Sequence, residues 1–391
     1  MLNLLSITIF ACFFAVINKR TYGVHRKFWL IIGACSTLLC SMYSTVQYQY
    51  NGKILAPFYK VGIEKTSVLK ERFQNFMYLG KRFRFGHSLL PLIYSLIAFC
   101  YGSNHFFEGF FFTCILSCIL FLFSQHLLFK IFDLFNISKR TEFCYCLLFH
   151  QPSLFFYGAL PIATSPVVFS LLLLLHSMIK GRPICVQILI LYLMFLFHKL
   201  FYLSFFAFIV FHIIIAGGFR WSALILKVAI SFYIALHVWR TKPYGGHLSY
   251  VFGHMCGNSY IPPTNGWLSR LLNFSLAPLL TNGCLFFYKA PNGSKLYWIY
   301  ATIVNIELVC MAIRIMYLRR FFPRLNKQGK ILCFVLFLFI VSFHVGGISV
   351  NNYCCNNRHL VNTTGVWIVL ALVLESGSCL QKNIFRKSTL A

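Results

Sequence analysis

The stretch FHQPSLFFYGALPIATSPVVFSLLLLLH, residues 149–176, begins and ends like a membrane-spanning helix but contains three prolines. The backbone of a membrane span tolerates a break only where protein or a cavity satisfies the freed polar groups. We therefore expect residues 152–166 to form a folded turn at the outer membrane face. From this turn the chain is predicted to re-enter the membrane at Val167.

The composition is typical of an integral membrane protein. Hydrophobic residues make up 59% of the chain, Phe occurs 45 times and the mean hydropathy is +0.73. Apolar runs of about 17–25 residues can cross a bilayer, and the sequence predicts an all-α membrane protein with about 12 transmembrane segments. The predicted segments are 1–17, 28–44, 88–101, 109–131, 143–160, 165–179, 184–197, 199–217, 221–239, 297–317, 331–350 and 362–378.

The whole chain, 1–391, is predicted to form a single polytopic membrane domain. The longest polar stretches are 45–87 and 240–296, which leave no room for a soluble domain of about 100 residues. Lys and Arg clusters at 318–330 and 382–387 mark the cytosolic side, because basic loops stay inside. We therefore expect 240–296, and also 45–87, to be outer, lumenal loops.

The basic segments 19–27 and 60–84 conflict under the same charge rule. Only one apolar run separates them, although both are strongly basic. Either one of them breaks the bias, or an unrecognised half-span lies within 45–87.

The charge balance limits the classes of function. The formal net charge is +28, from 35 Lys and Arg against seven Asp and Glu. Basic flanks attract anionic headgroups, and no basic surface with interleaved aromatic residues on a soluble domain indicates nucleic acid. Pumps and channels usually place ionisable groups inside their spans, and here these spans hold little beyond histidines and the near-terminal Glu307 and Glu375. The sixteen cysteines lack zinc-site spacing, so neither a metal nor a cofactor is expected.

The first long loop is predicted to contain an interfacial helix between Thr66 and Leu79. Apolar side chains would face lipid and polar side chains would face water, which is the pattern of a helix lying in the membrane interface. The apolar set is Val68, Leu69, Phe73, Phe76 and Met77, and the polar set is Lys70, Glu71, Arg72 and Asn75.

A series of motifs recurs in order along the chain. The first group surrounds the opening stretch, and the second lies near the end. They are Pro152, 155–158, Ser165, Phe169 and 180–182, followed by Gly346, Gly347, Arg358 and Trp367. In order and spacing they resemble the GT-C superfamily of multi-spanning glycosyltransferases that use lipid-linked sugars. Within it the chain is most similar to the PIG-V family, the second mannosyltransferase of glycosylphosphatidylinositol (GPI) anchor assembly.

Two acidic positions of that family differ in this chain. The family's Trp-Asp pair at the interfacial helix corresponds to Val68 and Leu69, with Glu71 two residues on. Its Ser-Glu pair corresponds to Ser165 and Pro166. These differences leave open a catalytically inactive GT-C-like subunit of a glycolipid-handling complex, and a bacterial O-antigen or exopolysaccharide polymerase is the other alternative.

The resemblance implies an endoplasmic reticulum, multi-pass mannosyltransferase acting at the lumenal face. It would move mannose from dolichyl-phosphate-mannose to a GPI-precursor glycolipid, in contact with membrane lipids and a small membrane partner subunit, without nucleic acid. An inverting transfer needs one carboxylate base, for which Glu71 is expected first and Glu64 second.

The leaving phosphate needs cations, because negative charge develops on it as the sugar leaves. The expected donor-phosphate residues are Arg358, His359, His198, Lys199, Arg82 and Arg84. The expected sugar-binding residues are Tyr157, Thr164 and Ser165.

Overall fold

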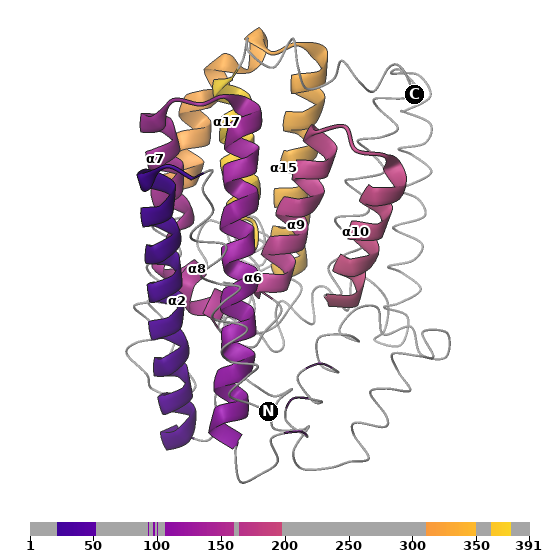
Figure 1. Ribbon diagram of the computed structural model, residues 1–391. Helices are drawn as coiled ribbons and strands as arrows, with labels where there is room; N and C mark the ends of the chain where they lie inside the picture. The colour runs from indigo at the N-terminus through magenta and orange to yellow at the C-terminus, as the bar shows by residue number, and fades with distance from the viewer. Residues whose placement is uncertain are drawn as a thin grey trace, which may run out of the picture. The chain divides into compact units, whose positions relative to one another are not determined.

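The computed structural model describes residues 22–51, 106–159, 164–197, 310–348 and 361–376, together with Ile93, Ile97 and Cys100. Within these ranges every regular element is a helix and there is no strand, which confirms the all-α prediction (Figure 1). The chain divides into two units, residues 1–199 and 200–391, and each is described by itself.

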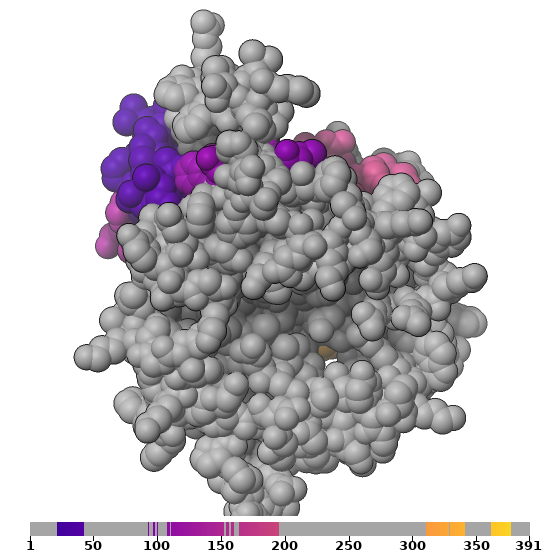
Figure 2. Space-filling model, turned by 90° about the horizontal axis from the view of Figure 1, so that it is seen from below, coloured from indigo at the N-terminus to yellow at the C-terminus, as the bar shows by residue number. Residues whose placement is uncertain are grey.

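The first unit contains six described helices. They are α2 (Val24–Asn51), α6 (Phe106–Phe135), α7 (Lys139–Phe149), α8 (Pro152–Ala159), α9 (Thr164–Ile179) and α10 (Ile184–Phe197). Contacts between α2 and α6 run in opposite order, since Arg26 meets Asp133 whereas Ser41 meets Cys118. The two helices are therefore antiparallel neighbours (Figure 1). Seen from below, α2 and α6 again lie side by side (Figure 2).

Helix α6 is the central apolar element of this unit and packs against α2, α8 and α9. Its section Phe111–Phe135 is long and apolar enough to cross a membrane, by length and composition. It is the one such helix among the described residues. The shorter apolar helices there are Thr164–Ile179, Ile184–Met194, Gly329–Ile340 and Thr364–Glu375.

Aromatic packing holds α6 against the helices that follow it. The rings of Phe121 and Phe149 stack with centroids 5.6 Å apart, and Phe155 meets Phe121 edge-on at 5.7 Å. Phe121 and Phe149 are buried, and offset or edge-to-face pairs of this kind add stabilisation beyond the area that they bury. The core of the first unit therefore lies around the middle of α6.

The predicted span 143–160 is wrong as a single helix. The structure divides it into α7 and α8, with a break at His150 and Gln151. Pro152 causes the break, because proline has no N–H to continue the helix and disfavours helical geometry in the preceding residue. As the first residue of α8 it is tolerated, since the N–H there has no helical partner in any case.

Local signals set the ends of the other helices. Ser138 caps α7, its hydroxyl oxygen accepting from the Thr141 amide at 3.2 Å. Gly181 ends α9 with a φ of 64°, a left-handed conformation that side chains disfavour. Pro166 lies in the first turn of α9, where it removes no helical hydrogen bond.

The second unit contains a helix over 310–318, the 3-10 helix η3 (Arg319–Arg324), α15 (Lys327–Ile348) and α17 (Thr364–Glu375). Helix α17 packs against α15 and also contacts η3. An ion pair between Arg314 and Glu375 joins the helix over 310–318 to the end of α17.

Candidate functional site

The break between α8 and α9, within the proline-containing stretch 149–176, lies beside the middle of α6. A Cβ added to Gly158 would lie 3.3 Å from both the Phe121 ring and the Ser165 hydroxyl, so α8 and α9 both reach this level. At roughly 1.5 Å per residue, Phe121 is about 15 Å along α6 from Phe111 and about 21 Å from Phe135. The break between α8 and α9 is therefore close to the midpoint of the membrane-capable section.

The prediction of a folded turn over residues 152–166 is wrong. Residues Pro152–Ala159 form helix α8, and α9 begins at Thr164, three residues before the predicted re-entry at Val167. The reason is that both outer prolines occupy first-turn positions, where helices accept them. Only residues 160–163 separate the two helices, and they lie outside the described residues.

Two of the predicted sugar-binding residues lie at this break. The Ser165 hydroxyl donates to the Gly158 carbonyl at 2.6 Å and so ties α9 to α8. Thr164 is completely buried, and its hydroxyl has no hydrogen-bond partner among the residues that the structure describes. Tyr157 belongs to α8, but its side chain lies outside the described part.

A buried imidazole and amide lie between α2, α6 and the start of α8. The Nδ1 of His150 lies 2.6 Å from the Cys146 carbonyl oxygen, and its Nε2 lies 2.5 Å from the Gln125 amide nitrogen. The Trp29 carbonyl lies 3.0 Å from the same Nε2, and the Trp29 ring lies 4.7 Å from the imidazole. Five polar residues in and between these helices are buried, Gln125, His150, Gln151, Thr164 and Ser165, and we refer to them together as the buried polar cluster. Hydrogen bonds join Gln125 to His150 and, separately, Ser165 to Gly158.

Helix α2 makes room for this cluster with a glycine. A Cβ at Gly33 would overlap the Gln125 side-chain amide, so no larger residue fits without displacing that amide. Among the described residues, the Gln125 carbonyl oxygen has no hydrogen-bond partner. Within the described part of the chain, the Gln125 amide oxygen and the Thr164 hydroxyl are thus two buried polar groups without a hydrogen-bond partner.

Carboxylates are engaged elsewhere in the described part of the chain. Asp133 and Glu142 both pair with Arg26, and Glu375 pairs with Arg314. Glu108 is exposed in the first turn of α6. No described carboxylate therefore belongs to the buried polar cluster, and a base acting there must come from another part of the chain.

The predicted catalytic and donor-phosphate residues fall outside the described residues. These are Glu71, Glu64, Arg82, Arg84, His198, Lys199, Arg358 and His359. The predicted interfacial helix over 66–79 does as well. Their roles stay predictions.

Comparison with known proteins gives no relative: no family model, no curated protein and no solved structure matches this chain. Among the described residues no group of three or more His, Cys, Asp or Glu is placed to hold a metal ion. The side chains of the buried polar cluster are two amides, two hydroxyls and one imidazole.

Two polar residues in apolar surroundings signal the cluster in the sequence, although the predictions above did not use them. Gln125 is an amide within the apolar section Phe111–Phe135, and His150 directly precedes Gln151 and a proline. A polar side chain inside an apolar run is costly unless it is paired with another group. That cost would have marked both residues as candidates.

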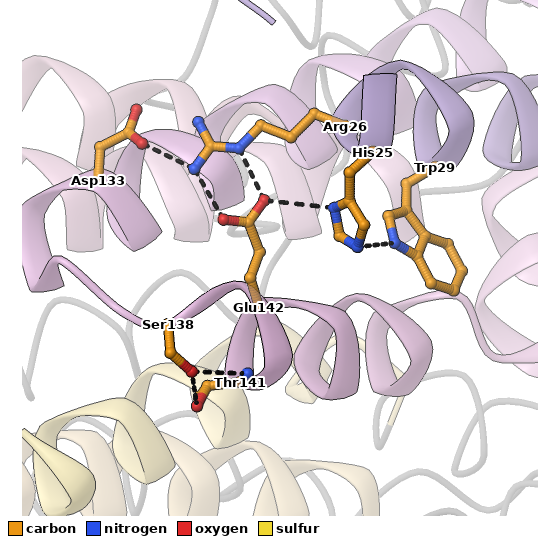
Figure 3. A network of polar contacts seen from close by, with 7 residues as sticks. All are labelled: His25, Arg26, Trp29, Asp133, Ser138, Thr141 and Glu142. Atoms are coloured by element: carbon orange, nitrogen blue, oxygen red, sulfur yellow. Dashed lines mark hydrogen bonds and ion pairs between the residues drawn. The ribbon is translucent and has the colours of Figure 1, made fainter. Parts of the chain in front are cut away.

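A second polar network lies at the end of the unit where α2 begins, α6 ends and α7 begins (Figure 3). Arg26 donates to both oxygens of Glu142, at 2.7 and 2.9 Å, and pairs with Asp133 at 2.7 Å. The hydrogen bonds to Glu142 raise the pKa of Arg26 above its ordinary value, so its charge is fixed. The guanidinium also lies 5.3 Å from the Phe129 ring centroid. We call Arg26, Asp133 and Glu142 the charge clasp.

The charge clasp is a joint between helices. It connects one residue from each of α2, α6 and α7, and Glu142 is buried. Asp133 lies about 18 Å along α6 from Phe121, at roughly 1.5 Å per residue, so the clasp is remote from the break between α8 and α9. His25 adds a weaker contact, with its Nδ1 3.8 Å from Glu142.

Proposed function

We propose that the chain is a membrane-embedded mannosyltransferase with a GT-C-like bundle of about 12 transmembrane segments. It adds the second mannose to a GPI-anchor precursor, with dolichyl-phosphate-mannose as donor, at the lumenal face of the endoplasmic reticulum membrane. The proposal starts from the resemblance to the PIG-V family and is supported by the features below.

One observation carries the proposal: the motifs of the resemblance coincide with a break between apolar helices. Pro152 begins α8, Ser165 lies in the first turn of α9, and the turn 180–182 follows α9. Within the membrane a helix is expected to break only where protein or a cavity satisfies the freed backbone N–H and C=O groups. The buried polar cluster beside it offers uncharged donors and acceptors, which suit a ligand with many hydroxyl groups better than an ion.

The arrangement of α2 and α6 supports an outer location for the proposed base. These helices are antiparallel, so the connection 52–105 begins and ends at one end of the pair. The opposite end carries Lys27, Lys139 and Arg140, which the charge rule assigns to the cytosol. In the proposed topology α2 ends and α6 begins on the lumenal side, so the loop that carries Glu71 leaves α2 on that side. The predicted segment 88–101 is then not a single full span between the two helices unless a half-span within 45–87 pairs with it.

In the proposed reaction the acceptor hydroxyl of the GPI precursor attacks the anomeric carbon of mannose. Glu71 begins to take the hydroxyl proton as the bond to the dolichyl phosphate breaks. Arg358 and His359, with His198 and Lys199, stabilise the negative charge that develops on the leaving phosphate. Tyr157, Thr164 and Ser165 orient the sugar. Of the two whose side chains the structure describes, Thr164 has the buried hydroxyl without a hydrogen-bond partner, whereas the Ser165 hydroxyl donates to Gly158.

A second candidate is a non-catalytic subunit that holds a lipid-linked glycan for a partner enzyme. One observation favours it. Pro166 lies in the first turn of α9, where the resembling family carries an acid, and no described carboxylate replaces that acid near the break. This candidate keeps the glycolipid ligand and omits the base.

Mannose transfer in microsomes tests the choice between the two candidates. Membranes containing the chain are given radiolabelled dolichyl-phosphate-mannose and a GPI precursor that carries one mannose. We expect transfer by the unchanged chain and by Glu108→Gln, and loss of transfer with Glu71→Gln at equal protein level. Full transfer by Glu71→Gln would remove Glu71 as the base, and absence of transfer by the unchanged chain would favour the non-catalytic subunit.

A further inference from the structure

The connection between the helix 310–318 and α15 carries a dense group of exposed and half-exposed cations. Leu318 and Leu325, which flank η3, are buried, whereas no residue of η3 itself is buried. The turn is therefore held at both ends while its side chains project outward. The cations are Arg319, Arg320, Arg324, Lys327 and Lys330, and we call them the basic turn.

Aromatic rings contact three of the five cations of the basic turn. The Arg320 guanidinium lies 3.9 Å from the centroid of Tyr317 and 4.8 Å from that of Phe321. Arg324 lies 5.5 Å from the same Phe321 ring. Lys330 lies 6.0 Å from Phe322. Contacts of this kind order the side chains and leave the positive charge unneutralised.

The basic turn has no acidic partner in the structure as described. The sequence contains no Asp or Glu between Glu307 and Glu375, and Glu375 is taken by Arg314. The five cations of the turn lie within residues 319–330 and therefore repel one another. An external anion would relieve that repulsion.

Apolar side chains continue from the basic turn along both flanking helices. Ile313 and Met316 are each 61% exposed on one side, and Phe337 of α15 is 53% exposed on the other. Tyr317 and Phe322 are exposed next to the cations. The order of apolar, aromatic and basic residues matches the order of hydrocarbon, interface and headgroup in a bilayer leaflet.

We propose that the basic turn binds the headgroups of anionic phospholipids in the cytosolic leaflet. The inference rests on the membrane placement in the proposed function but does not depend on mannose transfer. Arginine held over an aromatic ring presents a planar fork to a phosphate, and several cations together favour a headgroup with net negative charge. The occupant is thus a surface of lipids such as phosphatidylserine, with Tyr317 and Phe322 at the interface.

Lipid titration of the purified full chain in a neutral detergent tests this inference. The titrants are dioctanoyl-phosphatidylserine, dioctanoyl-phosphatidylcholine and inorganic phosphate, and the readout is the thermal unfolding midpoint. We expect a saturable rise with phosphatidylserine only. In the variant R319Q/R320Q/R324Q the apparent affinity should fall on the order of 100-fold, since each basic residue at the surface contributes about fivefold.

The variant K139Q/R140Q/K180Q is the matched control, because it removes the same charge from exposed positions of the first unit. It should keep the phosphatidylserine response, and R319K/R320K/R324K should keep most of it. Equal responses to both lipids, an equal response to inorganic phosphate, or equal loss in the control would each overturn the assignment. If the glutamine variant does not fold, the comparison of phosphatidylserine with phosphatidylcholine on the unchanged chain still tests lipid binding. Mannose transfer is measured in parallel, so that failure of lipid binding can be told apart from failure of the proposed enzyme activity.

Discussion

Replacing Arg26 by Gln is the sharpest test of the charge clasp. The change leaves the Glu142 carboxylate buried with a side-chain exposure of 9% and no guanidinium partner. Removing one partner of a buried ion pair costs about 3–5 kcal/mol. Arg26 is itself 19% exposed and Asp133 is 45% exposed, so the lower end, about 3 kcal/mol, is expected. For a unit of this size that lowers the thermal unfolding midpoint by roughly 6–12 °C.

The double variant R26Q/E142Q identifies the cause of the loss. A neutral amide in place of the Glu142 carboxylate no longer needs a cation, so most of the lost stability should return, about 2 kcal/mol. Thermal unfolding of the purified chain in detergent, followed by intrinsic fluorescence, measures both variants. Lys27→Gln, one position along α2, is the control and should change stability by less than about 0.5 kcal/mol. Two results would contradict the charge clasp as a joint between helices. One is an R26Q variant that is as stable as the control, and the other is an R26Q/E142Q variant that is less stable than R26Q.

Two further variants test the buried polar cluster by the same unfolding measurement. Gly33→Ala should destabilise by roughly 1–3 kcal/mol because its Cβ overlaps the Gln125 amide, and G33A/Q125A should recover most of this. Gly23→Ala is the control, since a Cβ there meets nothing within 4 Å, and equal behaviour of the two alanine variants would contradict the packing. Ser165→Ala should lower the free energy of unfolding by about 1 kcal/mol, because the hydrogen bond to the Gly158 carbonyl is lost. Ser170→Ala is the control and should cost less, because its hydroxyl donates within its own helix. A larger loss in Ser170→Ala would contradict a hydrogen bond that joins α8 to α9.

Runs of apolar residues predicted two helices of the first unit closely. The predicted run 184–197 matches α10, and 165–179 begins one residue after α9 does. The run 109–131 underestimates α6 at both ends, because Glu108 and Asp133 bound the apolar count without ending the helix. Helix length follows backbone hydrogen bonds, which a count of apolar residues does not measure.

The proline-containing stretch was harder to interpret from the sequence. Its prolines indicated a turn, whereas Pro152 and Pro166 each lie in the first turn of a helix, where they are tolerated. The position of proline within a helix depends on where the helix starts. Gln151 before Pro152 is not a typical capping residue, whereas Thr164 and Ser165 before Pro166 are of capping type and could have marked the start of α9. The stretch is therefore two helices and a short break rather than one extended turn.

The polar interior could not be predicted, because its partners are far apart in the sequence. His150 meets the Trp29 carbonyl, and Arg26 meets Glu142, across more than 100 residues in each case. Single residues indicate only that a partner is needed. The helix packing that supplies the partner becomes visible only in three dimensions.

Complementation in yeast is the strongest test of the proposed enzyme. A strain that lacks its second GPI mannosyltransferase is given this chain, and growth is measured together with the glycan of its GPI precursors. We predict restored growth and precursors that carry two mannoses, with both lost again in Glu71→Gln. Expression of the chain in the membrane, with precursors that still carry one mannose, would show that the chain is not this mannosyltransferase.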